Sequence, residues 1–360
     1  MAEVASLAGV SAQTVSRVAN GDPAVSPGTR RKVLDAMGTL DYRPNSAARA
    51  LRRGDFRTLG VITRGLSDSG TVPGTGDVRT LEALVTSAAH EGYAVTLIPL
   101  DALNQEDVTG AFARLDELAV DAVALMVELP LLDTALLAVP PHAKVVVVES
   151  DASGPFPAVG TDQHQGADTA VRHLLDLGHR TVWHVAGPEG STAARHRAAA
   201  WEEALRRAGR PIPPPLRGDG TAGSGHTAGL RLAHEPDCTA VFAADDQMAL
   251  GVLRALHESG RRVPEDVSVV GFGDIPTAGS LIPPLTTIRV DRAALGRLCV
   301  DAMVRQLRGE SPTGTTLVPT ALVERESTAT PPRRPDPLSS VFRPRASGVA
   351  DWCHCRTCTG

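Results

Sequence analysis

The sequence predicts a small all-α unit at the N-terminus, followed by an α/β core of two lobes, each built on a doubly wound parallel sheet. Residues 2–40 carry helix-start and helix-stop signals but no strand pattern. From Thr58 onward, short apolar runs alternate with longer helical patterns, which is typical of parallel sheets covered on both faces. About 270 residues of this alternation exceed one open sheet, so we expect two lobes.

Composition excludes several classes of protein. Apolar residues make up 42% of the 360 residues and aromatic residues only 3%, so we expect a globular chain with cores of Ala, Val and Leu. No apolar run approaches the roughly 18 residues of a membrane span, and the N-terminus lacks the pattern of a secretory signal. We therefore expect a cytoplasmic protein without membrane contact, in which Cys238 and Cys299 are small buried thiols.

Three helices are predicted in the N-terminal unit, covering residues 2–8, 12–18 and 27–40. The first ends at Gly9, and Ser11 caps the second, which Asn20-Gly21 stops. Ser26-Pro27, a capping residue followed by proline, begins the third. Its predicted apolar face consists of Val33, Met37 and Leu40.

The first two helices have the form of a helix-turn-helix in the basic part of the chain. Residues 1–53 carry net charge +4, which leaves −9 for the remainder, so polyanion binding is expected here. Small and apolar side chains pack the two helices together: Ala5, Ala8, Val10, Val15 and Val18. The side chains left outward suit base edges in a major groove: Ala12, Gln13, Ser16 and Arg17. Ser11, Thr14 and Asn20 suit phosphate contacts, and a solvated helical hairpin is the alternative for this segment alone.

Further motifs follow in order along the chain. They occupy residues 25–33 (VSPGTRRKV), 40–51 (LDYRPNSAARAL), 173–180 (HLLDLGHR), 244–251 (ADDQMALG), 263–272 (VPEDVSVVGF) and 282–288 (IPPLTTI). With these motifs, the chain from residue 2 to about residue 329 closely resembles the lac-repressor-like family, also called LacI/GalR. The resemblance implies a DNA-binding domain at 1–45, a hinge helix and linker at 46–57, and an effector-binding and dimerisation domain at 58–330.

The resemblance also implies further DNA contacts, which fall on Ser26, Thr29, Tyr42, Asn45, Ala48 and Leu51. Leu51 matches the position whose side chain wedges between base pairs in the minor groove, although a leucine buried against the core is the alternative. The start of the chain departs from the family. A capping Thr and basic residues usually precede the first helix, whereas Met1 stands almost at the helix here. Either phosphate contacts are fewer or translation starts upstream.

The predicted strands of the core cover residues 59–63, 95–98, 122–127, 145–148, 182–185, 241–244 and 267–271, with the first crossing between lobes near residues 160–162. This pattern is similar to the periplasmic-binding-protein architecture, whose ligand lies between the lobes at the carboxyl ends of strands. Glu149, Asp245 and Asp274 follow strands, and Arg197 matches the position where family members place an arginine on the effector. Helix capping is the alternative for each acidic residue.

The expected effector is a sugar or related polyol. Gly273 replaces the first of two aspartates found in many relatives, and Gly220 falls where a relative has a tryptophan against the sugar, so a galactoside is disfavoured.

Two weaker motifs are set aside. Residues 218–223 match G-x-G-x-x-G, but residues 211–215 before them are too rich in proline for the strand that dinucleotide binding requires. Residues 353–358 contain possible zinc ligands without a second pair, in a tail at 331–360 that we expect to be disordered.

The predicted function is that of a transcriptional regulator, most simply a repressor, that binds double-stranded operator DNA as a homodimer under effector control. No cofactor, metal or catalytic group is predicted. A solute-binding protein of a transport system would share the two lobes, and an enzyme on the same sheets is a more distant alternative.

Overall fold

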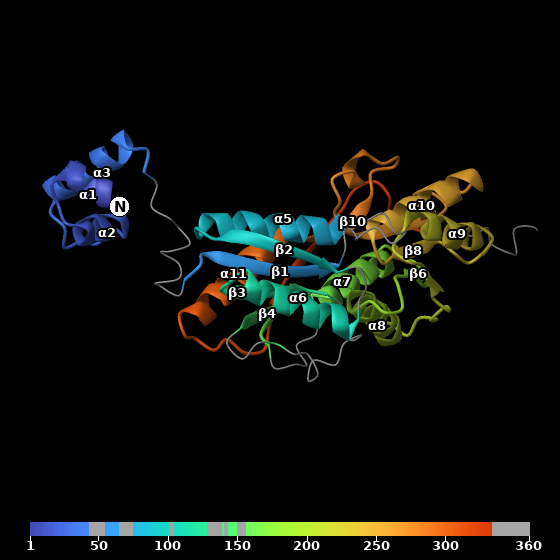
Figure 1. Cartoon of the computed structure of the whole chain (residues 1–360). Coiled ribbons are helices and arrows are strands. Elements are labelled where there is room, and N and C mark those ends of the chain that lie inside the picture. The colour runs from blue at the N-terminus through green and yellow to red at the C-terminus, as the bar shows by residue number, and fades with distance from the viewer. Residues whose placement is uncertain are drawn as a thin grey trace, which may run out of the picture.

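The computed structural model describes residues 1–42, 55–64, 75–100, 104–127, 139, 143–149 and 156–332. Figure 1 shows a three-helix N-terminal unit and an α/β core. Within the described ranges, no helix combines the length and apolar character that crossing a membrane requires. The predicted hinge helix and nearly all of the predicted tail lie outside these ranges.

The N-terminal unit consists of α1 (Ala2–Ala8), α2 (Ala12–Ala19) and α3 (Pro27–Thr39). Gly9 has a φ of 64°, which permits the tight turn between α1 and α2, as predicted. The helices share a small core made by Val4, Ala5, Val15, Val18, Val33, Ala36 and Met37. The prediction for Leu40 is wrong: α3 ends at Thr39, and Leu40 leaves the apolar face and is 40% exposed.

The first lobe of the core is a six-stranded sheet in the order β11-β5-β4-β3-β1-β2. Its strands are β1 (Thr58–Arg64), β2 (Ala94–Leu100), β3 (Ala122–Met126), β4 (Lys144–Val148), β5 (Ala158–Thr161) and β11 (Thr315–Val318). The paired strands are parallel. Helices α5 (Thr75–His90) and α11 (Arg292–Leu307) pack on one face, and α6 (Gln105–Glu117) packs on the other.

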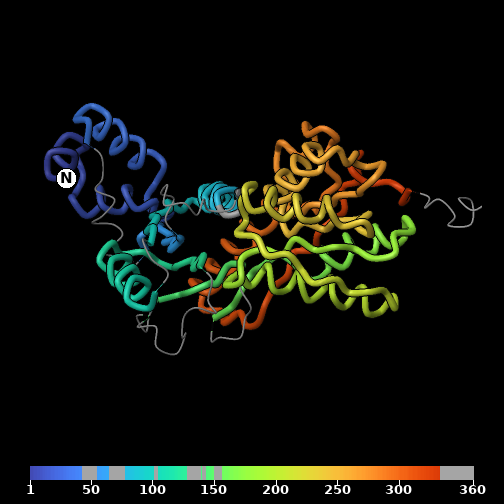
Figure 2. The backbone as a smooth tube through the Cα atoms, turned by 90° about the vertical axis from the view of Figure 1, so that its right-hand side faces the viewer, coloured from blue at the N-terminus to red at the C-terminus, as the bar shows by residue number. Residues whose placement is uncertain are grey.

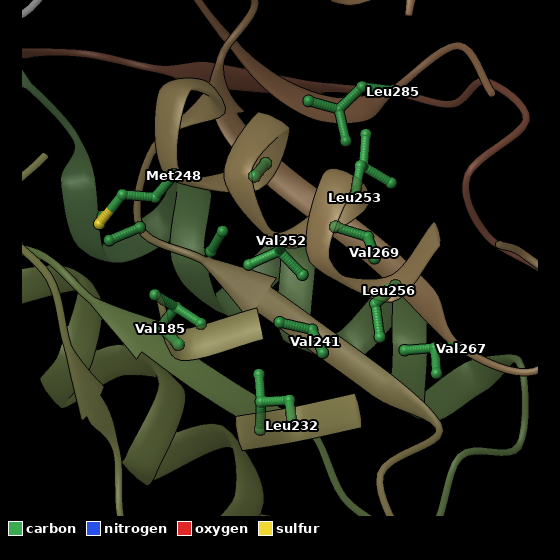
Figure 3. Packing of buried hydrophobic residues seen from close by; sticks show 14 of the residues in the cluster. Val185, Leu232, Val241, Met248, Val252, Leu253, Leu256, Val267, Val269 and Leu285 are labelled. Atoms are coloured by element: carbon green, nitrogen blue, oxygen red, sulfur yellow. The ribbon is translucent and has the colours of Figure 1, made fainter. Parts of the chain in front are cut away.

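The second lobe is a six-stranded sheet in the order β12-β10-β9-β8-β6-β7. Its strands are β6 (Trp183–Ala186), β7 (Leu216–Arg217), β8 (Ala240–Ala243), β9 (Ser268–Gly273), β10 (Thr286–Val290) and β12 (Thr320–Val323). Helices α9 (Ala222–Ala233) and α10 (Asp246–Glu258) cover one face, where aliphatic side chains fill the core (Figure 3). Helices α7 (Gln163–Asp176) and α8 (Thr192–Arg207) cover the other face.

The chain crosses between the lobes three times. It leaves the first sheet after β5 and enters α7 at Gln163, which confirms the predicted first crossing. It returns between β10 and α11 at Asp291, and crosses again between β11 and β12 at Pro319. C-terminal segments therefore occur in both lobes (Figure 2). These crossings set the two sheets end to end, so the strand ends of both face one region.

Candidate DNA-reading surface and effector cleft

Helix α2 presents the predicted DNA-reading side chains on the face opposite its core. Val15 and Val18 are 0% and 5% exposed, because they pack against α1 and α3. Ala12, Gln13 and Arg17 are exposed, and Ser16 is half-buried. Arg17 lies 3.8 Å from an Asp22 carboxylate oxygen, but its side chain remains 58% exposed. A weak, exposed ion pair of this kind leaves the guanidinium available to a base.

Matching Ser–Thr pairs stand at the starts of α2 and α3. Ser11 Oγ accepts from the Thr14 backbone N–H at 3.1 Å, and Ser26 Oγ accepts from Thr29 N–H at 3.3 Å. Both serines were predicted as caps, and both pairs also join their hydroxyls, at 3.0 and 2.9 Å. Ser11 and Thr14, two of the three predicted phosphate contacts, therefore lie at a helix N-terminus, where the helix dipole favours an anion.

The other predicted DNA contacts are placed unevenly. The Asn20 amide donates to Ser16 Oγ at 3.4 Å, at the end of α2. Tyr42 packs against the core of the N-terminal unit. Asn45, Ala48 and Leu51 lie outside the described residues, so the minor-groove contact stays a prediction.

A hydrogen-bonded chain joins the lobes at the first crossing. Glu149 follows β4 in the left-handed region, with a φ of 57°. Its carboxylate accepts from the Thr161 amide N–H at 3.1 Å and from the Thr161 hydroxyl at 2.6 Å. It also accepts from the Gln163 side-chain amide at 3.2 Å. Gln163 Oε1 in turn accepts from Arg197 Nε at 2.8 Å. Glu149 and Arg197, which were both predicted to contact an effector, are thereby linked through Gln163, which was not.

Arg197 lies in α8, in the helix where it was predicted, and its guanidinium is held from several sides. One NH2 group donates to the Ala244 carbonyl at the end of β8, and the guanidinium carbon lies 4.0 Å from the centre of the Phe272 ring. Burial lowers the pKa of Arg197, while the carboxylates of Asp245 and Glu149 oppose that effect. The guanidinium is therefore held between the Phe272 ring, the Ala244 carbonyl and the Gln163 amide oxygen.

Asp245 and Asp246 begin α10 but face different partners. Asp245 accepts from the Met248 N–H at 2.8 Å as the N-cap, and burial raises its pKa. A side chain at Gly220 would begin 3.7 Å from an Asp245 oxygen, so position 220 lies next to Asp245. Asp246, which sequence reasoning missed, is 1% exposed and accepts from the Ile275 N–H at 2.8 Å.

Asp274 is held by arginines. Its two carboxylate oxygens accept from Arg325 and from Arg289 Nε, both at 2.7 Å. Burial acts to raise the pKa of Asp274, but the hydrogen bonds from these arginines outweigh it and the pKa is lowered. The Asp274 carbonyl accepts from Arg79 of α5 in the first lobe at 3.2 Å. Contact between this carboxylate and an effector stays a prediction, and here it anchors the loop after β9.

Of the two motifs set aside earlier, the possible zinc ligands at 353–358 lie outside the described residues. The glycine-rich segment joins β7, a two-residue strand that begins just after the prolines, to α9. Among the described residues, no group of three or more His, Cys, Asp or Glu side chains is arranged to hold a metal ion. Cys238 and Cys299 are buried free thiols, as predicted.

A helix-turn-helix unit, followed by two lobes that polar side chains link near their strand ends, defines a DNA-binding regulator with a periplasmic-binding-protein-like core. The family model for bacterial regulatory proteins of the lacI family matches residues 1–45. The model for a periplasmic binding protein-like domain matches residues 171–328.

Individual relatives match over most of the chain. The lactose operon repressor of Escherichia coli K12 is 35% identical over 335 residues, which cover 91% of this chain and 90% of the repressor. The ribose operon repressor of E. coli K12 is 30% identical, covering 85% and 92%. The transcriptional regulator CelR of Thermobifida fusca is 35% identical, covering 90% and 96%.

Solved structures give the same assignment. The lac repressor dimer bound to operator and the anti-inducer ONPF matches with a TM-score of 0.81 and 33% identity, over 91% of this chain and 98% of that one. The complex of CelR with cellobiose matches with a TM-score of 0.66 and 30% identity, over 90% and 98%. This chain belongs to the lacI family of bacterial regulatory proteins. It is a sequence-specific DNA-binding transcription regulator. This confirms the function predicted from the sequence, and the alternatives of a transport-system binding protein and an enzyme are not supported.

Proposed function

We propose that the chain represses transcription from an operator and that a carbohydrate or related polyol binds in the cleft between the lobes to control this activity. The observation that carries the proposal is the chain from Glu149 through Gln163 to Arg197, with the guanidinium over the Phe272 ring. A carboxylate and a guanidinium supply acceptors and donors for ligand hydroxyls, and the buried Phe272 ring holds the guanidinium plane in place.

The relatives support the effector class. CelR was solved with cellobiose, and two further relatives are named as lactose and ribose operon repressors. Asp245, which caps α10 beside Gly220, is proposed as a further acceptor for the ligand. The cytoplasm, where operator DNA is found, is the proposed compartment.

We propose that the protein acts as a homodimer, since a pair of N-terminal units can read two half-sites in successive major grooves. Exposed apolar side chains on the core support a self-association surface: Val78 and Val85 of α5 are 48% and 42% exposed, and Ile282 is 96% exposed. Helix α5 and the loop before β10, which carries Ile282, both lie at the top of the core in Figure 1. A solved relative is a dimer on its operator.

The test has two stages. Thermal-shift measurements with cellobiose, lactose and ribose identify a sugar that raises the melting temperature, and a footprint on genomic fragments identifies the operator. That sugar is then titrated into preformed operator complexes of the parent and of Arg197→Ala. We expect the variant to bind operator with the parent's affinity but to need at least tenfold more sugar for release, since it lacks the guanidinium.

Arg206→Ala is the matched control, because Arg206 lies on the same helix, is 61% exposed and pairs with Glu202. It should respond to sugar as the parent does. Release of Arg197→Ala at the parent's sugar concentration would show that Arg197 does not bind the effector.

A further inference from the structure

Gln163 occupies the first crossing between the lobes and is buried there, at 7% exposed. It is the first residue of α7, and the two residues before it are Thr161, which ends β5, and the N-cap Asp162. Its side chain spans from the first lobe to the second, because Glu149 follows β4 and Arg197 lies on α8. Its two contacts therefore join groups that the chain brings in from separate sheets.

The two contacts require opposite hydrogen-bonding roles. Gln163 Nε2 donates to the Glu149 carboxylate at 3.2 Å, and Gln163 Oε1 accepts from Arg197 Nε at 2.8 Å. A carboxylate offers only acceptors and a guanidinium only donors, so a neutral side chain between them must do both. The amide satisfies both groups without adding a charge, and it fixes which edge of the guanidinium faces the cleft.

The remaining contacts leave the direction of Arg197 dependent on this bond. The Ala244 carbonyl accepts from a terminal nitrogen, and the Phe272 ring restrains the guanidinium plane. Neither contact engages Nε. With Nε released, the guanidinium can turn within its plane and lose its alignment to a ligand.

We infer that Gln163 is a positioning residue of the effector site, which aligns Arg197 with Glu149 across the crossing and thereby sets effector affinity. This inference rests on the proposed function for its link to an effector. The alignment itself is a property of the effector-free protein and is testable without any ligand.

The first test measures hydrogen exchange of the Arg197 Nε–H by NMR in the full-length, effector-free protein, with the signal assigned by its loss in Arg197→Lys. Gln163→Met, which keeps the side-chain length but neither polar role, should exchange at least tenfold faster than the parent. Gln165→Met is the matched control, because Gln165 lies on the same helix and accepts from the Thr320 N–H and hydroxyl instead. Unchanged exchange in Gln163→Met, or equal acceleration in Gln165→Met, would overturn the inference.

The second test exchanges the two roles between positions. Gln163→Glu places two carboxylates in contact and should lower the melting temperature of the effector-free protein. The double variant Glu149→Gln with Gln163→Glu restores a donor facing an acceptor, while the carboxylate introduced at position 163 still accepts from Arg197. The melting temperature should therefore recover part of the loss, and recovery is incomplete because the same Glu149 oxygen also accepts from the Thr161 N–H. A double variant no more stable than Gln163→Glu would refute the Glu149 contact, since packing alone predicts no such recovery.

The third test uses cellobiose as the probe. We expect Gln163→Met to raise its Kd at least tenfold, with Gln165→Met unchanged. An unchanged Kd in Gln163→Met would overturn the effect on affinity. If neither cellobiose, lactose nor ribose binds the parent, the carbohydrate proposal fails, whereas the exchange and melting measurements still decide whether Gln163 aligns Arg197 with Glu149.

Discussion

Asp246 makes the stability of the second lobe depend on pH, with a sign that the structure specifies. The carboxyl is 1% exposed, and burial raises its pKa from 3.8 to about 6, although hydrogen bonds from Thr287 and the Ile275 N–H oppose the increase. The neighbouring carboxylates of Asp245 and Asp274 add to it. Between pH 4 and pH 6 the folded protein therefore keeps a proton that the unfolded chain has lost. Because the folded state binds more protons there, the free energy of unfolding falls as pH rises through this window.

The magnitude follows from the two pKa values. A pKa raised from 3.8 to about 6 corresponds to about 3 kcal/mol of lost stability at neutral pH. Asp246→Asn removes the ionisation and keeps an oxygen that accepts from Thr287. We expect the stability of the parent minus that of the variant to fall by about 2 kcal/mol between pH 4 and pH 7, because part of the loss has already occurred at pH 4.

The assay is urea unfolding of both proteins at a series of pH values, and the difference between them cancels the titration of groups that do not interact with Asp246. Asp266→Asn is the control. Its Arg262 partner holds the pKa of Asp266 down at about 2, so the contribution of Asp266 to stability changes little above pH 4. A stability difference for Asp246→Asn that stays constant or grows with pH would refute the assignment of a buried, proton-holding carboxyl.

Other substitutions test the second lobe and the DNA-reading helix. His184 is buried between Trp201 and Phe242, and burial lowers its pKa to about 4. The stability of the parent minus that of His184→Phe should therefore rise by about 3 kcal/mol from pH 4 to pH 7, opposite in sign to the Asp246 effect. A difference in urea unfolding that does not change with pH would contradict this. A side chain at Gly251 would overlap the Ala222 carbonyl oxygen of α9, so Gly251→Ala should lower the free energy of unfolding in urea by roughly 1–3 kcal/mol. A side chain at Gly110 in α6 would meet nothing within 4 Å, so Gly110→Ala should raise the free energy of unfolding by up to about 1 kcal/mol. Equal stabilities for these two variants would exclude a backbone clash. Arg17→Ala should lose about 1–3 kcal/mol of discrimination per half-site while keeping weak, salt-sensitive DNA binding, and an unchanged footprint would refute the base contact.

Local signals were sufficient to predict the N-terminal unit. Ser11 and Ser26 cap their helices as expected, because the groups involved lie within three residues along the chain. The prediction for Leu40 was wrong because periodicity alone does not say at which turn a helix ends.

Strands were predicted where they are continuous and apolar, which located β1–β4, β6, β8 and β9. The pattern did not reveal β5, β7, β10, β11 and β12. Strands β10 and β11 begin with paired threonines, and β7 has only two residues. Such strands are identified by the partner they pair with, and that partner is distant in sequence: β11 pairs with β5, and β12 with β10.

Contacts with partners distant in sequence also limit how much of the candidate site can be predicted. Glu149, Asp245 and Arg197 could be proposed as effector contacts because the first two follow strands and the third matches a family position; this stays a prediction. Gln163 and Asp246 could not, since nothing in a glutamine or a second aspartate says that it is buried. Asp274 carries the same positional signal as Glu149, but its arginine partners come from 15 and 51 residues further along the chain.

The three crossings explain why a contact at Arg197 can act on the first lobe. An effector changes a conformational equilibrium only through unequal affinity for two arrangements, and lobes joined at three points move relative to one another by bending there. Polar contacts lie at these crossings: the Asp162 N–H donates to the Val318 carbonyl at 2.9 Å, Gln165 accepts from Thr320 within the second lobe, and Gln163 links Glu149 of the first lobe to Arg197 of the second. Of these three contacts, only the last includes a residue proposed to touch the effector. The N-terminal unit precedes β1 of the first lobe in the chain, and Gln163 and Arg197 both lie on helices of the second lobe. The bond between Gln163 and Glu149 is therefore where an effector held at Arg197, as proposed, would act on the lobe that follows the DNA-reading helices.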